Sequence, residues 1–362
     1  MSDFAKQIED IEKEIRETPY HKGTERHIGI LRARLSRLKD KVLDSQVRAK
    51  GGGGRVGYSV KHQGDATIVL VGPPSVGKST LLNALTNAQS KVAPYSFTTV
   101  SVIPGMMNFR NAKIQILDVP GLIEGAEVGR GRGKEVLSVV RGCDLLVIIT
   151  EVGKENAIER IKNALEKNGI RIDKKKPDIK IDKKLQGGLE IHSNIRQSID
   201  KETVKEIVME MGIKNADVTI KEKITMENLF DSLSRNRVYI PSISVINKSD
   251  LSVDKPNTDH LSLDTIFISA ETGLNLDKLR GLIWQKLNFI TVYLVKDNEE
   301  PNTNNPYVAK HGTKLLEILG SLGSNFSENK TYARVWGSGA RFPGQEVSLS
   351  AYAVDGMQIR FI

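Results

Sequence analysis

The chain has 362 residues, of which 39% are hydrophobic and 27% are charged, and its formal net charge is +9. This length can form two or three domains with hydrophobic cores, and its apolar runs are too short to cross a bilayer. A single cysteine, Cys143, excludes an internal disulfide, and the N-terminal segment lacks the apolar core of a secretory signal. We therefore expect a cytoplasmic protein with no membrane partner and no disulfide partner.

Two amphipathic helices are predicted over residues 3–17 and 25–47, because apolar side chains recur there at three- and four-residue spacings. Thr18-Pro19 breaks the first helix, so residues 1–55 are expected to form a helical hairpin that ends at the flexible run Gly51–Gly54. Nine basic residues and two acids lie between Arg26 and Arg55. This cluster is compatible with a polyanionic partner and also with a solvated helix face.

From Ala66 the pattern changes to short β-rich runs, one of them YIPSISVIN at Tyr239–Asn247, that alternate with helices, which predicts a mostly parallel α/β sheet within residues 64–289. The interval from Asp118 to Asn247 is about twice the roughly 60 residues that two βα units need. We expect a small α/β subdomain inserted at about residues 155–236, where a second basic cluster runs from Arg160 to Lys184. Residues 290–362 contain one helix among short strands and are predicted to form a compact module whose order resembles a β-grasp.

The segment GPPSVGKST follows a predicted strand and precedes a predicted helix, which is the setting of a phosphate-binding P-loop. Its backbone N–H groups would point at phosphate oxygens, Lys78 would bridge the β- and γ-phosphates, and Ser79 would bind magnesium. The predicted nucleotide-contacting residues of this segment are Gly72, Pro73, Pro74, Ser75, Val76, Gly77, Lys78, Ser79 and Thr80.

Two further segments predict groups around the phosphates. Asp118 ends a strand and is the candidate second magnesium ligand, and Gly121 could present its N–H to the γ-phosphate. Between this segment and the P-loop, Thr99 is the expected third magnesium ligand, and Thr98 is the alternative ligand. Both threonines could instead be β-forming residues of a strand with no role in binding magnesium. Lys78, Thr99 and Gly121 are therefore the predicted catalytic residues.

Two segments at later strand ends predict selection of guanine. In Asn247-Lys248-Ser249-Asp250, the Asp250 carboxylate could accept hydrogen bonds from N1 and the 2-amino group of guanine, a donor pair that adenine lacks. In Ser269-Ala270-Glu271, a backbone N–H could meet guanine O6. The predicted ligands are therefore GTP or GDP with Mg²⁺, and an ATPase is disfavoured because Asn247, Lys248 and Asp250 are all present.

Taken together, these residues resemble the developmentally regulated GTP-binding proteins of the Obg-related GTPases. The matching segments are GPPSVGKST, FTTV followed by IPG, DVPGLIEGA with GRGRGK, NKSD, SAETG and YARVWG, in the family's order. The resemblance implies an N-terminal helical hairpin, a P-loop GTPase domain with an inserted α/β subdomain, and a C-terminal TGS domain of β-grasp type. It also implies association with ribosomes and RNA, and a dedicated zinc-finger partner protein.

Leu122 stands where other GTPases carry the glutamine that orients water, so hydrolysis must use other groups. Backbone groups, a monovalent cation such as potassium, or a partner's residues are open alternatives, although Ser75 replaces the asparagine that holds potassium in activated relatives. Arg130 and Arg132 could act as an arginine finger or as contacts to RNA phosphates. The sequence thus predicts a slow GTPase that controls ribosome association, with a nucleotide-latched scaffold as the alternative.

Overall fold

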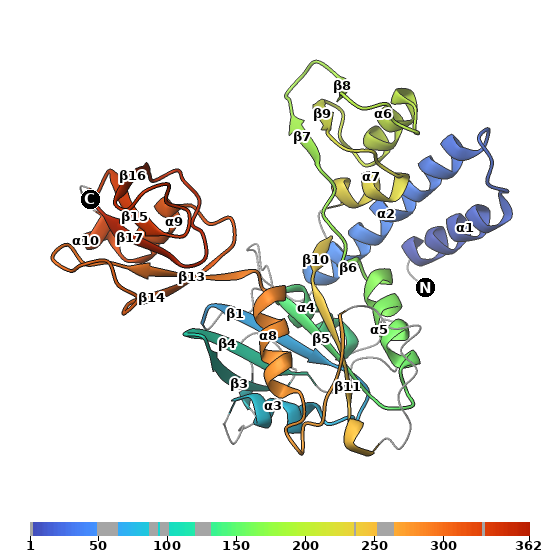
Figure 1. Cartoon of the computed structure of the whole chain (residues 1–362). Coiled ribbons are helices and arrows are strands. Elements are labelled where there is room, and N and C mark those ends of the chain that lie inside the picture. The colour runs from blue at the N-terminus through green and yellow to red at the C-terminus, as the bar shows by residue number, and fades with distance from the viewer. Residues whose placement is uncertain are drawn as a thin grey trace. The chain divides into compact units, whose positions relative to one another are not determined.

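The structure is a computed structural model, drawn in Figure 1. It describes residues 3–48, 64–86, 93–94, 101–119, 132–234, 237–251, 264–327 and 330–362. The chain divides into two compact units, each of which is discontinuous in sequence. The first unit comprises Met1–Gly57 with Gly169–Tyr239, and the second comprises Tyr58–Asn168 with Ile240–Ile362.

A mostly parallel sheet forms the centre of the second unit. Its strands are β1 (Ala66–Val71), β2 (Ala93–Pro94), β3 (Ser101–Phe109), β4 (Ala112–Asp118), β5 (Leu145–Glu151), β11 (Ser242–Asn247) and β12 (Thr265–Phe267). Among the described residues the order is β12-β11-β5-β1-β4-β3-β2, and the first five strands of this order are parallel. Their carboxyl ends therefore meet at one edge, where ligands bind in open α/β sheets.

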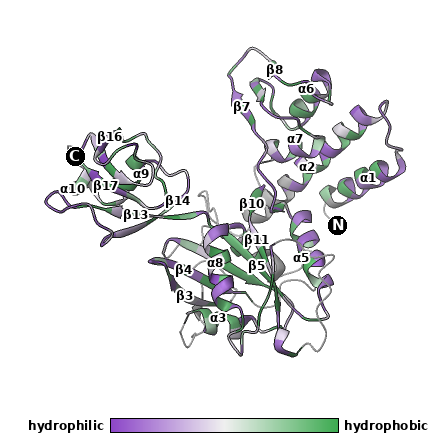
Figure 2. Cartoon of the chain, in the orientation of Figure 1, coloured by the Kyte–Doolittle hydropathy of each residue, from purple (hydrophilic) through white to green (hydrophobic). Residues whose placement is uncertain are grey.

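Helices cover both faces of this sheet, so its central strands are buried along their whole length instead of alternately. The helices are α3 (Lys78–Thr86), α4 (Arg132–Arg141), α5 (Asn156–Lys167) and α8 (Leu276–Lys286). All six side chains of β1 are buried, and Figure 2 shows the hydrophobic colouring of β5 and β11. On one face Ile68 and Leu70 pack in one cluster with Leu81 of α3 and Leu279 of α8. The core of the unit thus lies directly behind the carboxyl edge.

A second, mixed sheet forms the C-terminal part of the same unit. Its strands are β13 (Phe289–Leu294), β14 (Pro306–Lys310), β15 (Tyr332–Gly337), β16 (Gln345–Ser348) and β17 (Met357–Phe361), and the same part of the chain contains the helices α9 (Leu315–Ser321) and α10 (Ser324–Ser327). The order is β14-β13-β17-β15-β16, with β13 parallel to β17 and the other pairs antiparallel. Leu315 and Ile318 of α9 are buried with Val292 and Ile359 of the sheet. A five-stranded sheet that packs against the helix α9 is the arrangement of the predicted β-grasp.

The first unit combines the N-terminal helical hairpin with the inserted segment. Its elements are α1 (Asp3–Glu17), α2 (Glu25–Arg48), β6 (Ile170–Ile172), β7 (Ile179–Lys183), β8 (Leu189–Ser193), α6 (Lys201–Glu210), β9 (Ala216–Ile220) and α7 (Met226–Leu233), and β10 (Val238–Ile240) pairs with β6. Ile11, Leu31 and Leu38 bury the contact between α1 and α2. Ala33 of α2 belongs to a separate cluster that includes Ile207 of α6. The hairpin and the insert therefore share a core.

Basic side chains of α2 pair with α6 in this unit. The Arg26 guanidinium makes two hydrogen bonds to the Glu206 carboxylate, and Arg34 Nε donates to Glu210 Oε1 at 3.2 Å. Arg37 Nη1 donates to the backbone carbonyl of Glu210 at 3.1 Å. Lys39 Nζ also donates to Glu12 Oε1 of α1 at 2.8 Å, so four of the basic residues that the sequence groups between Arg26 and Arg55 have partners inside the unit. The three arginine contacts hold α2 against the insert, while the side chains of Arg26 and Arg34 stay more than half exposed.

Two features differ from the sequence-based expectation. The strand predicted from Tyr239 to Asn247 is instead two strands in different sheets, because Pro241 has no N–H for the ladder. The boundary between the units falls at Gly169, later than the predicted start of the insert near residue 155. The reason is that α5 packs beside β5 and buries Ile161 and Leu165 there.

The predicted fold class is confirmed: the chain is an α/β protein with a mostly parallel central sheet, a helical hairpin, an inserted α/β segment and a C-terminal β-grasp. Within the part of the chain that the structure describes, none of the helices combines the length and the apolar character required to cross a bilayer.

Candidate nucleotide-binding site

The P-loop connects the end of β1 to the start of α3 through a backbone path that two glycines permit. A Cβ on Gly72 would lie 2.2 Å from the carbonyl oxygen of Ile149, and a Cβ on Gly77 would lie 2.4 Å from Nδ2 of Asn247. Gly77 also has a φ of +90°, and Ser75 has a φ of 62°. Residues with a side chain rarely adopt a positive φ, so contacts to the neighbouring strands must hold the loop in this conformation.

Lys78 is buried at the start of α3 and directs its ammonium back into the loop. Its Nζ donates to the carbonyl oxygens of Gly72 at 3.2 Å and Pro73 at 2.8 Å. Burial lowers the pKa of Lys78, and the nearby Asp118 carboxylate partly opposes this shift. A buried cation inside a loop of backbone N–H groups is suited to binding a phosphate anion.

Ser79 and Asp118 come together beside the loop. Asp118 ends β4, which pairs with β1 so that Leu70 lies opposite Asp118. The Ser79 hydroxyl donates to Asp118 Oδ2 at 2.6 Å, while Asp118 Oδ1 is buried and has no hydrogen-bond partner among the described residues. A hydroxyl and a carboxylate with one free oxygen are hard oxygen donors, so this pair fits a Mg²⁺ ion.

Asn247 ties three segments together at the end of β11. Its Nδ2 donates to the carbonyl oxygen of Val76 at 2.9 Å, and its Oδ1 accepts from the backbone N–H of Ala270 at 2.9 Å. The side chain is only 3% exposed, so both bonds are shielded from water. Asn247 thereby fixes the P-loop and the segment at Ser269 relative to each other.

Lys248 makes the neighbouring contact, to a partner that the sequence did not indicate. Lys248 Nζ donates to the carbonyl oxygen of Ser75 at 3.0 Å and to Glu151 Oε2 at 2.6 Å. Hydrogen bonds from Lys154 and from Lys248 lower the pKa of Glu151. The available signal was the position of Glu151 as the last residue of the strand LLVIITE, at the same sheet edge as Asn247.

The remaining predicted residues differ in exposure. Asp250 lies exposed in a short 3₁₀ turn, η2 (Ser249–Leu251), directly after Lys248. Ser269 is buried, and its hydroxyl accepts from the backbone N–H of Thr272 at 3.2 Å. The side chains that face solvent are those of Pro74, Thr80 and Glu271, together with Ser75 and Ser79. Predicted residues from four distant segments of the chain therefore gather at one sheet edge.

Known proteins resemble this chain over nearly its whole length. A family model described as 50S ribosome-binding GTPase matches residues 67–183, and a model for the C-terminal region of the MMR_HSR1 domain matches residues 186–289. Developmentally-regulated GTP-binding protein 1 of Xenopus laevis is 39% identical over 352 residues, which cover 96% of this chain and 95% of that protein. The chain belongs to the developmentally regulated GTP-binding protein family.

Proteins from other, distant organisms are similar to this chain to a comparable extent. A GTP-binding protein of Methanocaldococcus jannaschii is 43% identical over 97% of this chain and 90% of its own length. Ribosome-interacting GTPase 1 of Saccharomyces cerevisiae is 36% identical over 97% of this chain and 96% of its own length. The likeness thus extends through the hairpin, the central sheet, the insert and the C-terminal part.

Several predicted residues of this family member lie outside the described residues. They are Thr98, Thr99, Gly121, Leu122 and Arg130. Their roles stay predictions, and so does the hinge at Gly51–Gly54.

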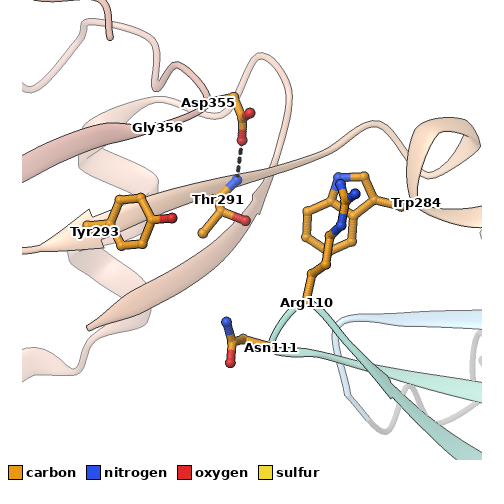
Figure 3. A pocket seen from close by; sticks show the side chains of 7 residues that line it. All are labelled: Arg110, Asn111, Trp284, Thr291, Tyr293, Asp355 and Gly356. Carbon is orange, nitrogen blue, oxygen red and sulfur yellow. Dashed lines mark hydrogen bonds between the residues drawn. The ribbon is translucent and has the colours of Figure 1, made fainter. Parts of the chain in front are cut away.

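A cavity of about 340 Å³ lies elsewhere in the second unit (Figure 3). It is lined by the turn at Arg110-Asn111, by Trp284 of α8 and by residues of the C-terminal sheet, and the Arg110 guanidinium stacks beside the Trp284 ring. Arg110 precedes the start of β4, whereas Asp118 ends it, and at about 3.3 Å per residue the strand alone spans roughly 20 Å. This cavity is separate from the P-loop site.

Proposed function

We propose that this chain binds GTP and GDP with Mg²⁺ and hydrolyses GTP to GDP and phosphate. The observation that carries the proposal is the pair of hydrogen bonds from Asn247 and Lys248 to adjacent P-loop carbonyls, because they join a phosphate-binding loop to a base-reading turn. In this proposal Asp250 accepts from N1 and the 2-amino group of guanine. Adenine would leave that carboxylate without donors, which selects for guanine.

Around the phosphates, Lys78 stabilises negative charge on the β- and γ-phosphates. Ser79 and Asp118 hold the Mg²⁺ ion, with Thr99 as the third protein ligand, and the bound ion supplies neutralisation of phosphate charge. The backbone N–H of Gly121 contacts the γ-phosphate. The loop Ser269–Glu271 reads guanine O6, and the hydrogen bond from Ala270 N–H to Asn247 supports this by fixing the loop.

Hydrolysis by the isolated chain is expected to be slow. Leu122 has no group that could orient the attacking water, so the intrinsic rate should be about 10⁻⁴ to 10⁻² per second, as in unassisted GTPases. Acceleration would then come from backbone groups, a potassium ion or a partner.

We further propose that the nucleotide state controls association with the ribosome or its RNA in the cytoplasm. Support comes from the description of the matching GTPase family and from the name of the yeast relative, Ribosome-interacting GTPase 1. Lys175 and Lys176 in the insert are exposed and suited to phosphate contacts. The domains are proposed as 1–55 for the hairpin, 64–289 for the GTPase domain and 290–362 for the TGS domain. A zinc-finger partner is proposed from the family resemblance.

Leu122 also favours a second candidate function, a nucleotide-latched scaffold in which GTP orders the binding surfaces and hydrolysis is incidental. The two candidates differ in how ribosomes affect turnover. A GTPase controlled by the ribosome hydrolyses GTP faster in single-turnover measurements when ribosomes are added, whereas a scaffold shows no acceleration.

The first experiment is calorimetric titration of the chain with GDP, GTP, ADP and ATP in the presence of Mg²⁺. The proposal expects binding of guanosine nucleotides and rejection of adenosine nucleotides, and equal affinity for both bases would overturn it. Lys78→Ala should lower GTP turnover about 100-fold or more. Lys278→Ala, which removes an exposed lysine of α8, is the matched control and should leave turnover unchanged.

The second experiment is sedimentation with ribosomes in GDP and in a non-hydrolysable GTP analogue across a salt series. The proposal expects more co-sedimentation with the analogue and a loss of binding as salt rises, since each phosphate contact contributes roughly 0.7 to 0.9 to the logarithmic slope. Equal binding in both nucleotide states would exclude control by the nucleotide.

A further inference from the structure

Lys248 is held between two acceptors from different parts of the second unit. Its ammonium lies 2.6 Å from Glu151 Oε2, at the end of β5, and 3.0 Å from the carbonyl oxygen of Ser75 in the P-loop. Lys248 also has a φ of 61°, so the chain turns sharply as it leaves β11. Its side chain is 38% exposed and that of Glu151 only 19%. The carboxylate is therefore the more firmly placed of the two groups.

The contact to Ser75 alone would hold this ammonium weakly. A lysine side chain is flexible and strongly hydrated, and a single carbonyl acceptor at a partly exposed site competes with water. The Glu151 carboxylate adds a shorter, charge-assisted hydrogen bond that fixes the ammonium in the position from which it reaches Ser75.

The P-loop needs such support where Lys248 meets it. Ser75 has a left-handed φ of 62°, an unfavourable conformation for a residue with a side chain. The carbonyl oxygens of Ser75 and Val76 accept from Lys248 and Asn247, so two consecutive peptide units of the loop are bound by one turn. Fixing Lys248 therefore helps to fix the shape of the phosphate-binding loop.

We propose that Glu151 is a positioning residue for the guanine nucleotide, which acts by orienting Lys248 against the P-loop. This inference rests on the proposed binding of GTP and GDP. Glu151 contributes to nucleotide affinity and residence time, because it stabilises the loop that binds the phosphates before the nucleotide arrives. The proposal gives it no part in the hydrolytic step, because its side chain contacts Lys248 and Lys154.

The test compares Glu151→Gln with wild type. We measure the dissociation constant and dissociation rate of fluorescently labelled GDP, and GTP turnover at saturating nucleotide. Loss of a charge-assisted hydrogen bond at a partly exposed site should weaken GDP binding roughly tenfold, mostly through faster dissociation. Turnover at saturation should stay within about twofold of wild type.

Lys154→Ala is the matched control. Lys154 pairs with the other oxygen of Glu151 at 2.5 Å but is 64% exposed, and among the described residues its ammonium has no hydrogen bond to the P-loop. Its removal should therefore leave GDP affinity within about twofold of wild type. A loss of affinity in Lys154→Ala as large as in Glu151→Gln would overturn the proposal, because it would indicate a general effect of charge.

A double-mutant cycle with Lys248→Met decides whether Glu151 acts through Lys248. The proposal expects that Glu151→Gln adds no further loss of affinity in the Lys248→Met background, whereas additive losses would overturn it. Thermal unfolding of each variant separates loss of the fold from loss of the contact. A wild-type chain that fails to bind guanosine nucleotides overturns the proposed function, whereas equal affinity of wild type and Glu151→Gln overturns only the role of Glu151.

Discussion

At the scale of single residues, the site depends on a glycine, Gly77, at a position where the neighbouring atoms leave no room for a side chain. Gly77 approaches Asn247 so closely that a Cβ would lie 2.4 Å from the amide nitrogen. That amide nitrogen also donates to the carbonyl oxygen of Val76. Displacing it would break the hydrogen bond that joins the P-loop to β11.

Gly77→Ala is therefore expected to abolish or strongly weaken guanine-nucleotide binding and to destabilise the fold by about 1–3 kcal/mol, because φ is +90° and the Cβ clashes. The measurements are GDP titration and chemical denaturation. Gly281→Ala is the control, because Gly281 lies inside α8 and a Cβ there would meet nothing within 4 Å. It should be neutral or stabilising by up to about 1 kcal/mol. Similar losses in both variants would contradict this account.

Most residues of this candidate site could be predicted from the sequence, because their types and spacings seldom occur together by chance. The glycines of the P-loop, Lys78 and Ser79 have fixed spacings along one segment, and the structure gathers them with Asp118 and Asn247 at one sheet edge. Glu151 was missed because a glutamate at a strand end has no distinctive local pattern. Only the three-dimensional neighbourhood shows that it meets Lys248.

At the scale of elements, helix α6 illustrates how local and tertiary terms combine. Asp200 caps its N-terminus, since the carboxylate accepts from the backbone N–H of Thr203 at 2.8 Å and from its hydroxyl at 2.8 Å. Its inner face buries Ile207 completely, while Glu206 on the outer face pairs with Arg26 of α2. The cap determines where the helix begins, and the buried face determines what it packs against.

The cap should make the stability of the first unit dependent on pH. Hydrogen bonds from Thr203 lower the pKa of Asp200 below its usual 3.8. The ionised cap therefore contributes fully above about pH 3.8 and is lost as the pH falls through the lowered value. Asp200→Ala should cost about 1 kcal/mol near pH 6, measured by chemical denaturation, and its difference from wild type should shrink below pH 3.8. Asp200→Asn, which keeps the acceptor, should lose only a few tenths of a kcal/mol.

Adjacent positions of α6 should differ in the cost of substitution. Ile207→Ala removes a fully buried side chain from the core shared with α2 and should cost about 2–5 kcal/mol. Glu206→Gln weakens an ion pair whose arginine is 62% exposed and should cost less than about 1 kcal/mol. Urea denaturation of both variants checks this order, and an equal cost would mean that the ion pair, and not the core, holds α2 to the insert.

Helices and strands with strong periodicity were predicted well, whereas their partners were not. Apolar spacing gave α1 and α2 nearly to the residue. It could not show that α2 packs on an insert far along the chain. Nothing in the sequence around Ala33 and the arginines of α2 indicates that their partners lie in α6. The sequence therefore left a polyanion-binding surface and a solvated face as alternatives for this helix, and three of its arginines pair within the unit.

At the scale of the whole molecule, the two units have separate cores and different relations to the proposed ligand. The residues of the candidate site belong to the second unit, whereas the first unit contains the hairpin and the sheet β7-β9-β8. A ligand stabilises the part of a protein to which it binds, by about 2.7 kcal/mol at a concentration 100 times the dissociation constant.

Hydrogen exchange should reveal this difference. Addition of GDP and Mg²⁺ is expected to slow exchange in β1, β5 and β11, which end at the site, because opening of these strands would release the ligand. Exchange in β7, β8 and β9 should change much less. Mass spectrometry of peptides from both units measures the effect, and equal protection of both would show that the nucleotide stabilises the molecule as one cooperative body.

The discontinuous build of both units has a consequence for biosynthesis. Arg34 and its partner Glu210 are 176 residues apart, so at about 5–20 residues per second the ribosome reaches α6 roughly 10 to 35 s after it has made α2. Throughout that time the nascent hairpin lacks the α6 partner of Ala33, which is buried in one cluster with Ile207 in the finished protein. The core of the second unit is also incomplete during this time, because β11 and α8 are translated after the insert. The first unit can complete its core only once the insert up to Tyr239 has been made, and the second only after α8, so both expose apolar surface that favours aggregation during much of translation.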